Sequence, residues 1–250
     1  MQYGICPLSI VPIRTLPEDS SEMTSQLLYG EHFKVLESRK KWSRIRVAHD
    51  KCEGWVSNHQ FKFITEEDYE QLDRPENQQL SPDIVSHVCS QDGMLLPIVL
   101  GSMVSSSTFL HHTFEGSSVT GHAQKNELVD VAFLYLKAPF LWGGKTPFGI
   151  DSAGFTQMVY KINGVALCRD AEGQSKQGEP LSFIEESEPG DLAFFDNNEG
   201  VIDHVGIILK DNYIIHTYGH VRIDRLDHTG IFNTEEKRYT HQLRVIKKII

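Results

Sequence analysis

Short apolar or alternating runs separated by turn residues fill the first 64 residues, and this spacing limits the fold more than any other feature of the sequence. The runs are Leu8–Ile13, Gln26–Tyr29, His32–Leu36, Trp42–Val47, Gly54–Ser57 and Phe61–Ile64. Strands of this length at this spacing are typical of small antiparallel barrels. We therefore predict a small β-barrel over residues 1–64.

The following sixty residues divide into a polar segment and a second strand-rich segment. Residues 65–79 contain six acidic side chains, one arginine and Pro75, a composition that suits a solvated linker or a short capped helix. Strand-like runs return at Ile84–Cys89, Leu95–Leu100 and Met103–Ser107. We predict an acidic linker over residues 65–82 and a second small β-barrel module over residues 83–124.

The hydrophobic pattern changes to a helical period near Asn126. Residues 128–136 contain one strongly polar side chain, which predicts a mostly buried helix with Asn126 as its candidate cap. A glycine-rich loop at 142–149 precedes a second predicted helix, which has Asp151 as its N-cap and one apolar face. Strand-like runs follow at Asp191–Phe195, His204–Leu209, Tyr213–His216, His220–Ile223 and Leu243–Ile250. Helices first and strands afterwards predict an α+β domain over residues 125–250, with helices packed on an antiparallel sheet.

Two histidines on consecutive predicted strands of this domain are candidate catalytic residues. If these strands pair as a hairpin, the imidazoles of His204 and His216 can meet across it. A nucleophile at a helix N-terminus, a base on a strand and a group that orients the base together form an activated nucleophile. The predicted helix starts with Ser152, however, and not with a cysteine. Two structural histidines are the alternative interpretation.

Five motifs in the C-terminal half resemble, in order and spacing, the NlpC family of papain-like bacterial peptidases. They are Leu141-Trp-Gly-Gly144, Phe148-Gly-Ile-Asp-Ser-Ala-Gly-Phe155, Pro189-Gly-Asp-Leu192, His204-Val-Gly-Ile207 and Ile215-His-Thr217. Residues 1–64, with Glu53-Gly-Trp-Val56, resemble the bacterial SH3-like modules that precede some of these peptidases. The resemblance implies one or two SH3-like barrels before a papain-like domain. It also implies cleavage of murein stem peptides between γ-D-glutamate and a diamino acid, with recognition of a free N-terminal L-alanine.

The same resemblance implies a role for each matching residue. Ser152 stands at the nucleophile position, His204 would be the base, and His216 would orient it. The implied substrate-binding residues are Asp151, Ala153, Trp142, Phe140, Glu31, Cys52 and Tyr218. Three of these have a structural alternative: Asp151 would only cap its helix, Glu31 would be a solvated turn residue, and Trp142 would pack in the core.

Several positions depart from the family pattern. Ser152 replaces the family's cysteine, Ala153 replaces the serine after it, and Phe140 replaces a tyrosine whose hydroxyl points toward the nucleophile. Cys52 replaces a tyrosine of the SH3-like module, and Tyr218 replaces a small residue that follows the second histidine. Together these departures favour a natural loss of catalysis. An engineered Cys→Ser change, a working Ser–His pair, and a non-catalytic peptide-binding or protein-interaction module are the alternatives, so whether the chain is an enzyme stays open.

Charge and composition exclude other classes of protein. The chain has 24 basic and 34 acidic side chains and a formal net charge of −10, whereas a nucleic-acid binder carries a basic stripe. No apolar run approaches the roughly 18 residues of a membrane span, and no basic leader precedes the first apolar run. Four widely spaced cysteines indicate reduced thiols. We therefore expect a cytoplasmic protein with no nucleic-acid partner. The resemblance to the NlpC family further implies a bacterial protein that takes small murein-derived peptides.

No cofactor or metal is expected from the sequence. His204 and His216 are two candidate ligands, and a structural zinc would need two more. A protein partner of the SH3-like modules is the remaining candidate partner.

Overall fold

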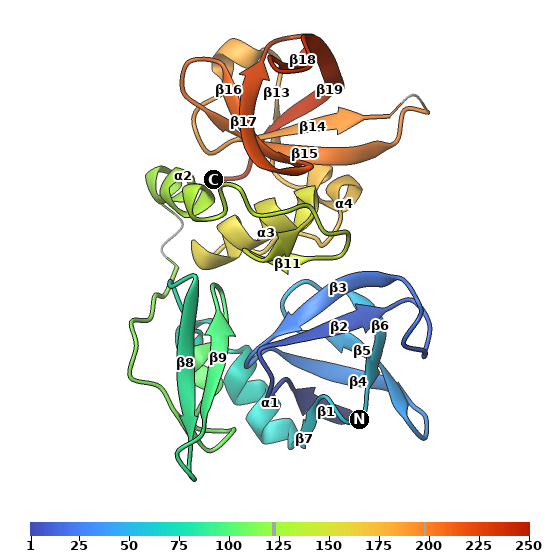
Figure 1. The fold of residues 1–250 in the computed structure, drawn as a ribbon, viewed down its shortest axis with the longest axis vertical. Helices are drawn as coiled ribbons and strands as arrows, with labels where there is room; N and C mark the ends of the chain where they lie inside the picture. Colours follow the sequence, from blue (N-terminus) through green and yellow to red (C-terminus); the bar gives the residue numbers. More distant parts are fainter. Residues whose placement is uncertain (122–123, 198) are drawn as a thin grey trace. The chain divides into compact units, whose positions relative to one another are not determined.

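The computed structural model describes residues 1–121, 124–197 and 199–250, which form two compact units. The first unit contains Met1–Thr120 and Trp142–Gly144, and the second contains Gly121–Leu141 and Lys145–Ile250. Each unit has its own sheets and is described by itself (Figure 1).

A seven-stranded antiparallel sheet forms most of the first unit, where a small barrel was predicted. Its strands are β1 (Gln2–Ile5), β2 (Ile10–Arg14), β3 (Met23–Leu28), β4 (His32–Ser38), β5 (Trp42–Val47), β6 (Glu53–Ser57) and β7 (Lys62–Ile64), in the spatial order β3-β2-β6-β5-β4-β1-β7. The buried side chains of Val11, Ile13, Phe33, Ile45 and Val56 contribute to its core. The sequence pattern missed β1, which pairs with both β4 and β7.

The acidic segment after this sheet contains a capped helix, the second of the two structures that its composition suits. Helix α1 (Glu66–Asp73) has a capping box, in which the Thr65 hydroxyl accepts from the backbone N–H of Asp68 and the Asp68 carboxylate accepts from that of Thr65. Tyr69 and Leu72 are buried, so the helix packs onto the unit. A short 3-10 helix (Pro75–Asn77) follows.

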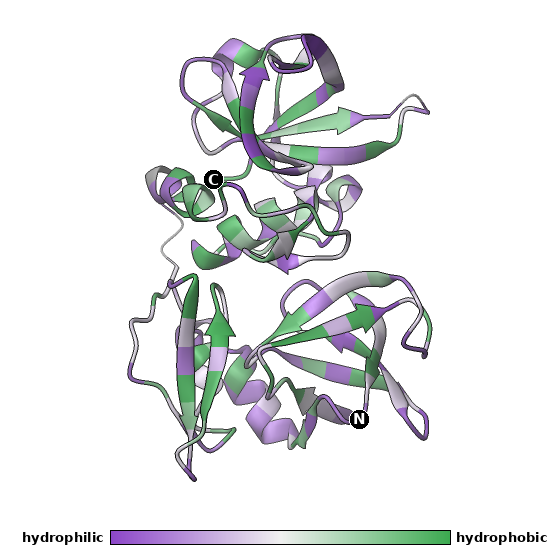
Figure 2. Cartoon of the chain, viewed as in Figure 1, coloured by the Kyte–Doolittle hydropathy of each residue, from purple (hydrophilic) through white to green (hydrophobic). Residues whose placement is uncertain are grey.

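The predicted second barrel is instead a three-stranded sheet. Its strands are β8 (Val85–Ser90), β9 (Leu95–Val99) and β10 (His112–Thr113), in the order β10-β8-β9. A 3-10 helix (Val104–Ser106) replaces the strand expected near Met103–Ser107. Val88 and Ile98 of this sheet share a core with Ile5 and Tyr29 of the seven-stranded sheet region. The described residues of 83–124 therefore do not form a separate hydrophobic core. The edge strand β9 is largely apolar (Figure 2).

The second unit is α+β, and its sheet closes into a barrel. Its elements are α2 (Lys125–Leu134), β11 (Lys145–Thr146), β12 (Gly149–Ile150), α3 (Ser152–Ile162), α4 (Ala171–Ser175), β13 (Glu179–Leu181), a 3-10 helix (Ile184–Glu186), β14 (Leu192–Asp196), β15 (Ile202–Leu209), β16 (Tyr213–Tyr218), β17 (His220–Leu226), β18 (Gly230–Asn233) and β19 (Arg238–Lys248). The antiparallel order β19-β14-β15-β16-β17-β18 returns to β19 through the β18–β19 pairing, and β13 adds to β19. The predicted antiparallel sheet is present, and β18, which the sequence pattern missed, closes it into a six-stranded barrel by pairing with β19.

The two main helices of this unit differ in burial. All residues of α3 are buried, and the helix packs against β15 and β16 (Figure 1). Helix α2 begins after Gln124, so Asn126 lies inside it and does not cap it. Phe133 and Leu134 are 44% and 40% exposed, so the prediction of a mostly buried helix was wrong. Within the described ranges, no helix has both the length and the apolar character needed to cross a bilayer.

Candidate active site

Ser152 is the first residue of α3, and Asp151 caps this helix as predicted. The Asp151 carboxylate accepts a hydrogen bond from the backbone N–H of Gly154 at 2.7 Å. Ser152 is 7% exposed. The first N–H groups of a helix have no acceptor within the helix, and its N-terminus carries partial positive charge. The position therefore suits an ionised nucleophile or a developing oxyanion.

Asp151 also forms a buried ion pair that the sequence analysis missed. Arg169 donates from Nη1 to Oδ1 at 3.0 Å and from Nη2 to Oδ2 at 2.7 Å. Both side chains are about nine-tenths buried. The guanidinium balances the charge of the carboxylate, so a substrate ammonium would compete with Arg169 for Asp151.

The two predicted histidines are in direct contact. Nε2 of His204 lies 2.9 Å from Nδ1 of His216, which confirms the predicted meeting of the rings. Gly206 lies opposite His216 in the β15–β16 register, and a Cβ at Gly206 would lie 2.9 Å from the Cβ of His216. Glycine therefore leaves room for this pair. No hydrogen bond joins Ser152 Oγ to His204 within the part of the chain that the structure describes.

A buried carboxylate on β17 orients the histidine pair. Oδ2 of Asp224 lies 3.0 Å from Nε2 of His216, and Arg222 donates to Oδ2 and Oδ1 of Asp224 at 2.7 and 3.1 Å. An ionised carboxylate only accepts, so Nε2 of His216 carries a proton. In the neutral ring Nδ1 of His216 then accepts from Nε2–H of His204. This order of protons leaves Nδ1 of His204 with its lone pair.

Burial keeps both histidines neutral. Burial, followed by the neighbouring His241 and His216, lowers the pKa of His204 well below its ordinary value. Burial also lowers the pKa of His216 and outweighs the opposing effect of Asp224. Burial raises the pKa of Asp224, but hydrogen bonds from His216 and Arg222 prevail and hold that pKa below its ordinary value. At neutral pH His204 is therefore an unprotonated but weak base.

A third histidine, His241 on β19, joins the pair and was not predicted. Its ring stacks on His204 with centroids 4.0 Å apart and an interplanar angle of 23°. Burial, with a contribution from His216, lowers the pKa of His241 to about 4. The sequence pattern started this strand only at Leu243 and ended the β17 run one residue before Asp224. Had that run been extended, its alternation would have placed Arg222 and Asp224 on one face.

Besides Asp151, three of the predicted substrate-binding residues belong to the second unit. Ala153 is buried in the first turn of α3 and its carbonyl accepts from Nε2 of Gln174 at 2.9 Å. Phe140 is 46% exposed, and its backbone N–H donates to the carbonyl of Gly219. The ring of Tyr218 lies edge-on to that of His241, with centroids 5.4 Å apart. Tyr218 thus borders the histidine cluster, and contact of these three residues with a substrate stays a prediction.

The other three, Glu31, Cys52 and Trp142, belong to the first unit. Glu31 is 2% exposed and accepts from the backbone N–H of Leu28 at 2.8 Å, so the interpretation as a solvated turn residue was wrong. Trp142 is 59% exposed and its indole N–H donates to Glu22 at 2.6 Å, so it does not pack in a core. Cys52 packs against the core of the seven-stranded sheet. All three are held by contacts within the first unit.

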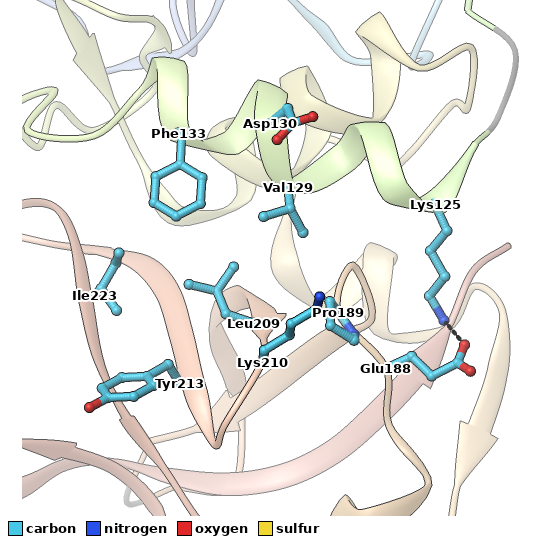
Figure 3. Close-up of a pocket in the computed structure, with 10 residues that line it drawn as sticks. All are labelled: Lys125, Val129, Asp130, Phe133, Glu188, Pro189, Leu209, Lys210, Tyr213 and Ile223. Atoms are coloured by element: carbon cyan, nitrogen blue, oxygen red, sulfur yellow. Dashed lines mark hydrogen bonds and ion pairs between the residues drawn. The ribbon is translucent and has the colours of Figure 1, made fainter.

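A cavity of about 770 Å³ lies at the opposite end of β15 from His204. It is lined by Val129 and Phe133 of α2 and by Leu209, Tyr213 and Ile223 of the barrel, whose side chains face one another in Figure 3. His204 and Leu209 are five residues apart on one strand, which corresponds to about 17 Å. The cavity is therefore separate from the histidine cluster.

Comparison with known proteins identifies a domain in each unit. Residues 137–243 match the NlpC/P60 family, and residues 13–61 match the bacterial dipeptidyl-peptidase Sh3 domain. Dipeptidyl-peptidase 6 of Lysinibacillus sphaericus is 26% identical over 236 residues, with 80% of this chain and 82% of that protein covered. A γ-D-glutamyl-L-lysine dipeptidyl-peptidase of Bacillus cereus is 34% identical over 94 residues, with 37% of this chain covered. The match spans only 28% of that relative.

A solved structure agrees with these domain matches. An NlpC/P60 family protein of Bacillus cereus has a TM-score of 0.80 to this chain at 17% identity, with 99% of both chains covered. The two domain matches fall on the same segments as the motifs found in the sequence. The chain therefore joins a bacterial dipeptidyl-peptidase SH3 domain to an NlpC/P60 domain, the domain of a peptidoglycan peptidase family.

Proposed function

We propose that this chain binds small murein stem peptides of the type L-Ala-γ-D-Glu-diamino acid, and that its cleavage of the γ-D-Glu bond is lost or weak. The observation that carries the proposal is that α3 presents a serine at its N-terminus while two barrel strands hold a pair of contacting histidines. Ser152 stands at a helix N-terminus, and the contact of His204 with His216, and of His216 with Asp224, supports the proposed roles of base and orienting partner. The names of two Bacillus relatives, γ-D-glutamyl-L-lysine dipeptidyl-peptidases, support the substrate class.

A serine demands more from this site than a cysteine would. A thiol has a pKa of about 8.5, which a helix N-terminus lowers toward neutrality. A hydroxyl must instead give up its proton to a base during attack. The lowered pKa of His204 makes it a weak base for that step, and Phe140 has no hydroxyl to donate to an oxyanion. The site is therefore better suited to holding a peptide than to attacking it.

We further propose that Asp151 binds the free N-terminal ammonium of the peptide in exchange for Arg169. Both groups carry one positive charge and donate to a carboxylate, so the exchange preserves the charge of the pocket. The exchange breaks the buried ion pair between Arg169 and Asp151, however, and the free energy lost in breaking it weakens the affinity for the amine.

Binding and cleavage by the wild-type chain are measured separately. Titration calorimetry with L-Ala-γ-D-Glu-diaminopimelate tests binding, the N-acetylated peptide is its matched control, and mass spectrometry tests cleavage. We expect saturable binding of the free-amine peptide, weaker binding of the acetylated one, and no accumulation of L-Ala-γ-D-Glu. Turnover at a rate typical of enzymes would overturn the loss of catalysis. Absence of binding would overturn the peptide proposal and favour an interaction module.

Restoring the thiol tests the assignment of the nucleophile position. In Ser152→Cys, the helix N-terminus contributes about 1–2 kcal/mol toward the thiolate, which lowers the thiol pKa from about 8.5 to about 7–8. Burial raises the pKa of the Cys6 thiol to about 12, so we expect iodoacetamide to label the new thiol of Ser152→Cys at least about a hundredfold faster than Cys6 at pH 7. Ser152→Ala is the matched control for labelling.

The same variant separates a decayed site from an engineered one. An absent oxyanion donor lowers the rate on the order of 100–1,000-fold, so we expect Ser152→Cys to label readily and cleave poorly. Adding Phe140→Tyr and Ala153→Ser is then expected to raise turnover further. Full turnover from Ser152→Cys alone would instead support an engineered Cys→Ser change. A slow thiol with an unshifted pKa would contradict the site assignment.

A further inference from the structure

Three imidazoles from three strands of the barrel converge on one point. His204 on β15, His216 on β16 and His241 on β19 each offer a ring nitrogen, and these nitrogens all lie within 4.8 Å of one another. His204 and His216 are buried, and His241 is half-buried. The base-and-orienter arrangement described above uses only the first two, so it does not account for the third.

The distance between the nitrogens of His204 and His216 is close to that of a tetrahedral metal site. Zn²⁺ binds imidazole nitrogen at about 2.0–2.1 Å, which places two nitrogen ligands about 3.3 Å apart. Nε2 of His204 and Nδ1 of His216 are already 2.9 Å apart, so they need to separate only slightly. Nδ1 of His241 lies 2.9 Å from Oγ1 of Thr240, which leaves Nε2 of His241 as the nitrogen that a rotation of its ring would direct at the metal.

The groups behind His216 are those that orient a metal ligand. Nε2 of His216 is held by the Asp224 carboxylate at 3.0 Å, and Arg222 holds that carboxylate in turn. Histidine ligands of zinc usually donate their other ring N–H to a carboxylate or carbonyl, which fixes the tautomer and raises the basicity of the ligating nitrogen. Asp224 thereby directs the lone pair of Nδ1 of His216 toward His204.

We propose that His204, His216 and His241 form a binding site for Zn²⁺, with the fourth coordination position open. Three imidazoles without a carboxylate ligand select zinc or another late transition metal over Mg²⁺ and Ca²⁺, which prefer oxygen ligands. Zinc would occupy the same two nitrogens that join His204 to His216. Metal binding and the hydrogen-bonded histidine pair therefore exclude each other. This proposal does not depend on peptide binding.

Titration of the full chain with ZnCl₂ after treatment with EDTA tests the site. We expect one zinc per chain with micromolar or tighter affinity, and no displacement by excess MgCl₂. Co²⁺ is the spectroscopic probe, and its visible absorption bands are expected to have the intensity of a tetrahedral site. His241→Gln is expected to weaken zinc binding at least tenfold. The matched control is His228→Gln, because His228 is exposed outside the cluster.

Three outcomes would overturn the proposal. One is the absence of stoichiometric zinc binding. Another is equal zinc affinity in wild type and His241→Gln, with circular dichroism showing that the variant is folded. The third is loss of binding in His228→Gln, which would assign the metal to the surface. If His241→Gln does not fold, Thr240→Val is the second test, because it removes the hydroxyl beside Nδ1 of His241. This variant is expected to change the cobalt spectrum, and an unchanged spectrum would count against the site.

Discussion

Asp224 gives the sharpest quantitative prediction for the second unit, through the variant Asp224→Ala. The substitution removes the acceptor of three hydrogen bonds, one from His216 and two from Arg222. The His216 side chain is fully buried, so its Nε2–H loses the one partner it has among the described residues, at about 1–3 kcal/mol. Arg222 keeps a contact with Glu235 at 3.1 Å and reaches solvent, which limits its loss to about 1 kcal/mol. We expect a total destabilisation of about 3 kcal/mol.

The assay must report the second unit specifically. The three tryptophans of the chain, Trp42, Trp55 and Trp142, all lie in the first unit, so fluorescence would follow the wrong part of the molecule. A chain of two units also has no single free energy of unfolding. Hydrogen exchange of peptides from β16 and β17, measured by mass spectrometry, reports the local free energy of opening. A loss of about 3 kcal/mol corresponds to about 150-fold faster exchange in these peptides.

The pH dependence of this effect has a definite sign. The pKa of Asp224 is lower in the folded protein than in the unfolded chain, so its contribution is complete above the unfolded value of about 4 and is lost as the pH falls through the folded value. The difference between wild type and Asp224→Ala should therefore shrink below about pH 4. The exposed Asp203 is the matched control, with an expected change of less than about 0.5 kcal/mol in Asp203→Ala. Protection of β16 and β17 within threefold of wild type at pH 7 would refute the reasoning.

Three further changes test packing, the substrate pocket and the first unit. Gly206→Ala places a Cβ 2.9 Å from that of His216, and we expect about 1–3 kcal/mol of destabilisation by hydrogen exchange of β15 and β16, with unchanged exchange counting against the close contact. Arg169→Gln removes the cation paired with Asp151, and we expect calorimetry to show tighter binding of free-amine peptide but not of acetylated peptide; weaker binding of the free-amine peptide would contradict the proposed exchange. Thr65→Ala removes the capping box of α1 and is expected to lower the stability of the first unit by about 0.5–2 kcal/mol, measured by tryptophan fluorescence in urea, whereas Thr65→Ser should retain it.

The sequence predicted the elements that have local signals. The cap at Asp151 and the apolar face of α3 follow from residue type and spacing within one turn or two. The contact between His204 and His216 follows from strand alternation and a hairpin. Both depend on neighbours in the chain, which a sequence displays directly.

The features that the sequence did not predict depend on contacts between residues that lie far apart in the chain. Arg169 reaches Asp151 across 18 positions. His241 reaches His204 because β14 pairs with both β19 and β15, which lie far apart in the sequence. The strand β18 has only four residues, too few for a periodic pattern, yet it turns the sheet into a barrel. The exposure of Phe133 likewise cannot be read from hydropathy, since an apolar residue gives the same signal at a cavity mouth and in a core.

The hydrogen-bonded chain from His216 through Asp224 to Arg222 has a consequence for how such proteins change over time. Because these groups are buried and satisfy one another across β16 and β17, replacing His216 or Asp224 penalises folding whether or not the protein performs chemistry. Replacement at position 152 carries no comparable folding cost, since a serine fits the first turn of a helix as well as a cysteine does. A protein that no longer cleaves peptides can therefore lose its nucleophile without losing stability, whereas selection for folding still retains the histidines. A search that identifies active peptidases by their histidines alone will therefore include inactive members of the family.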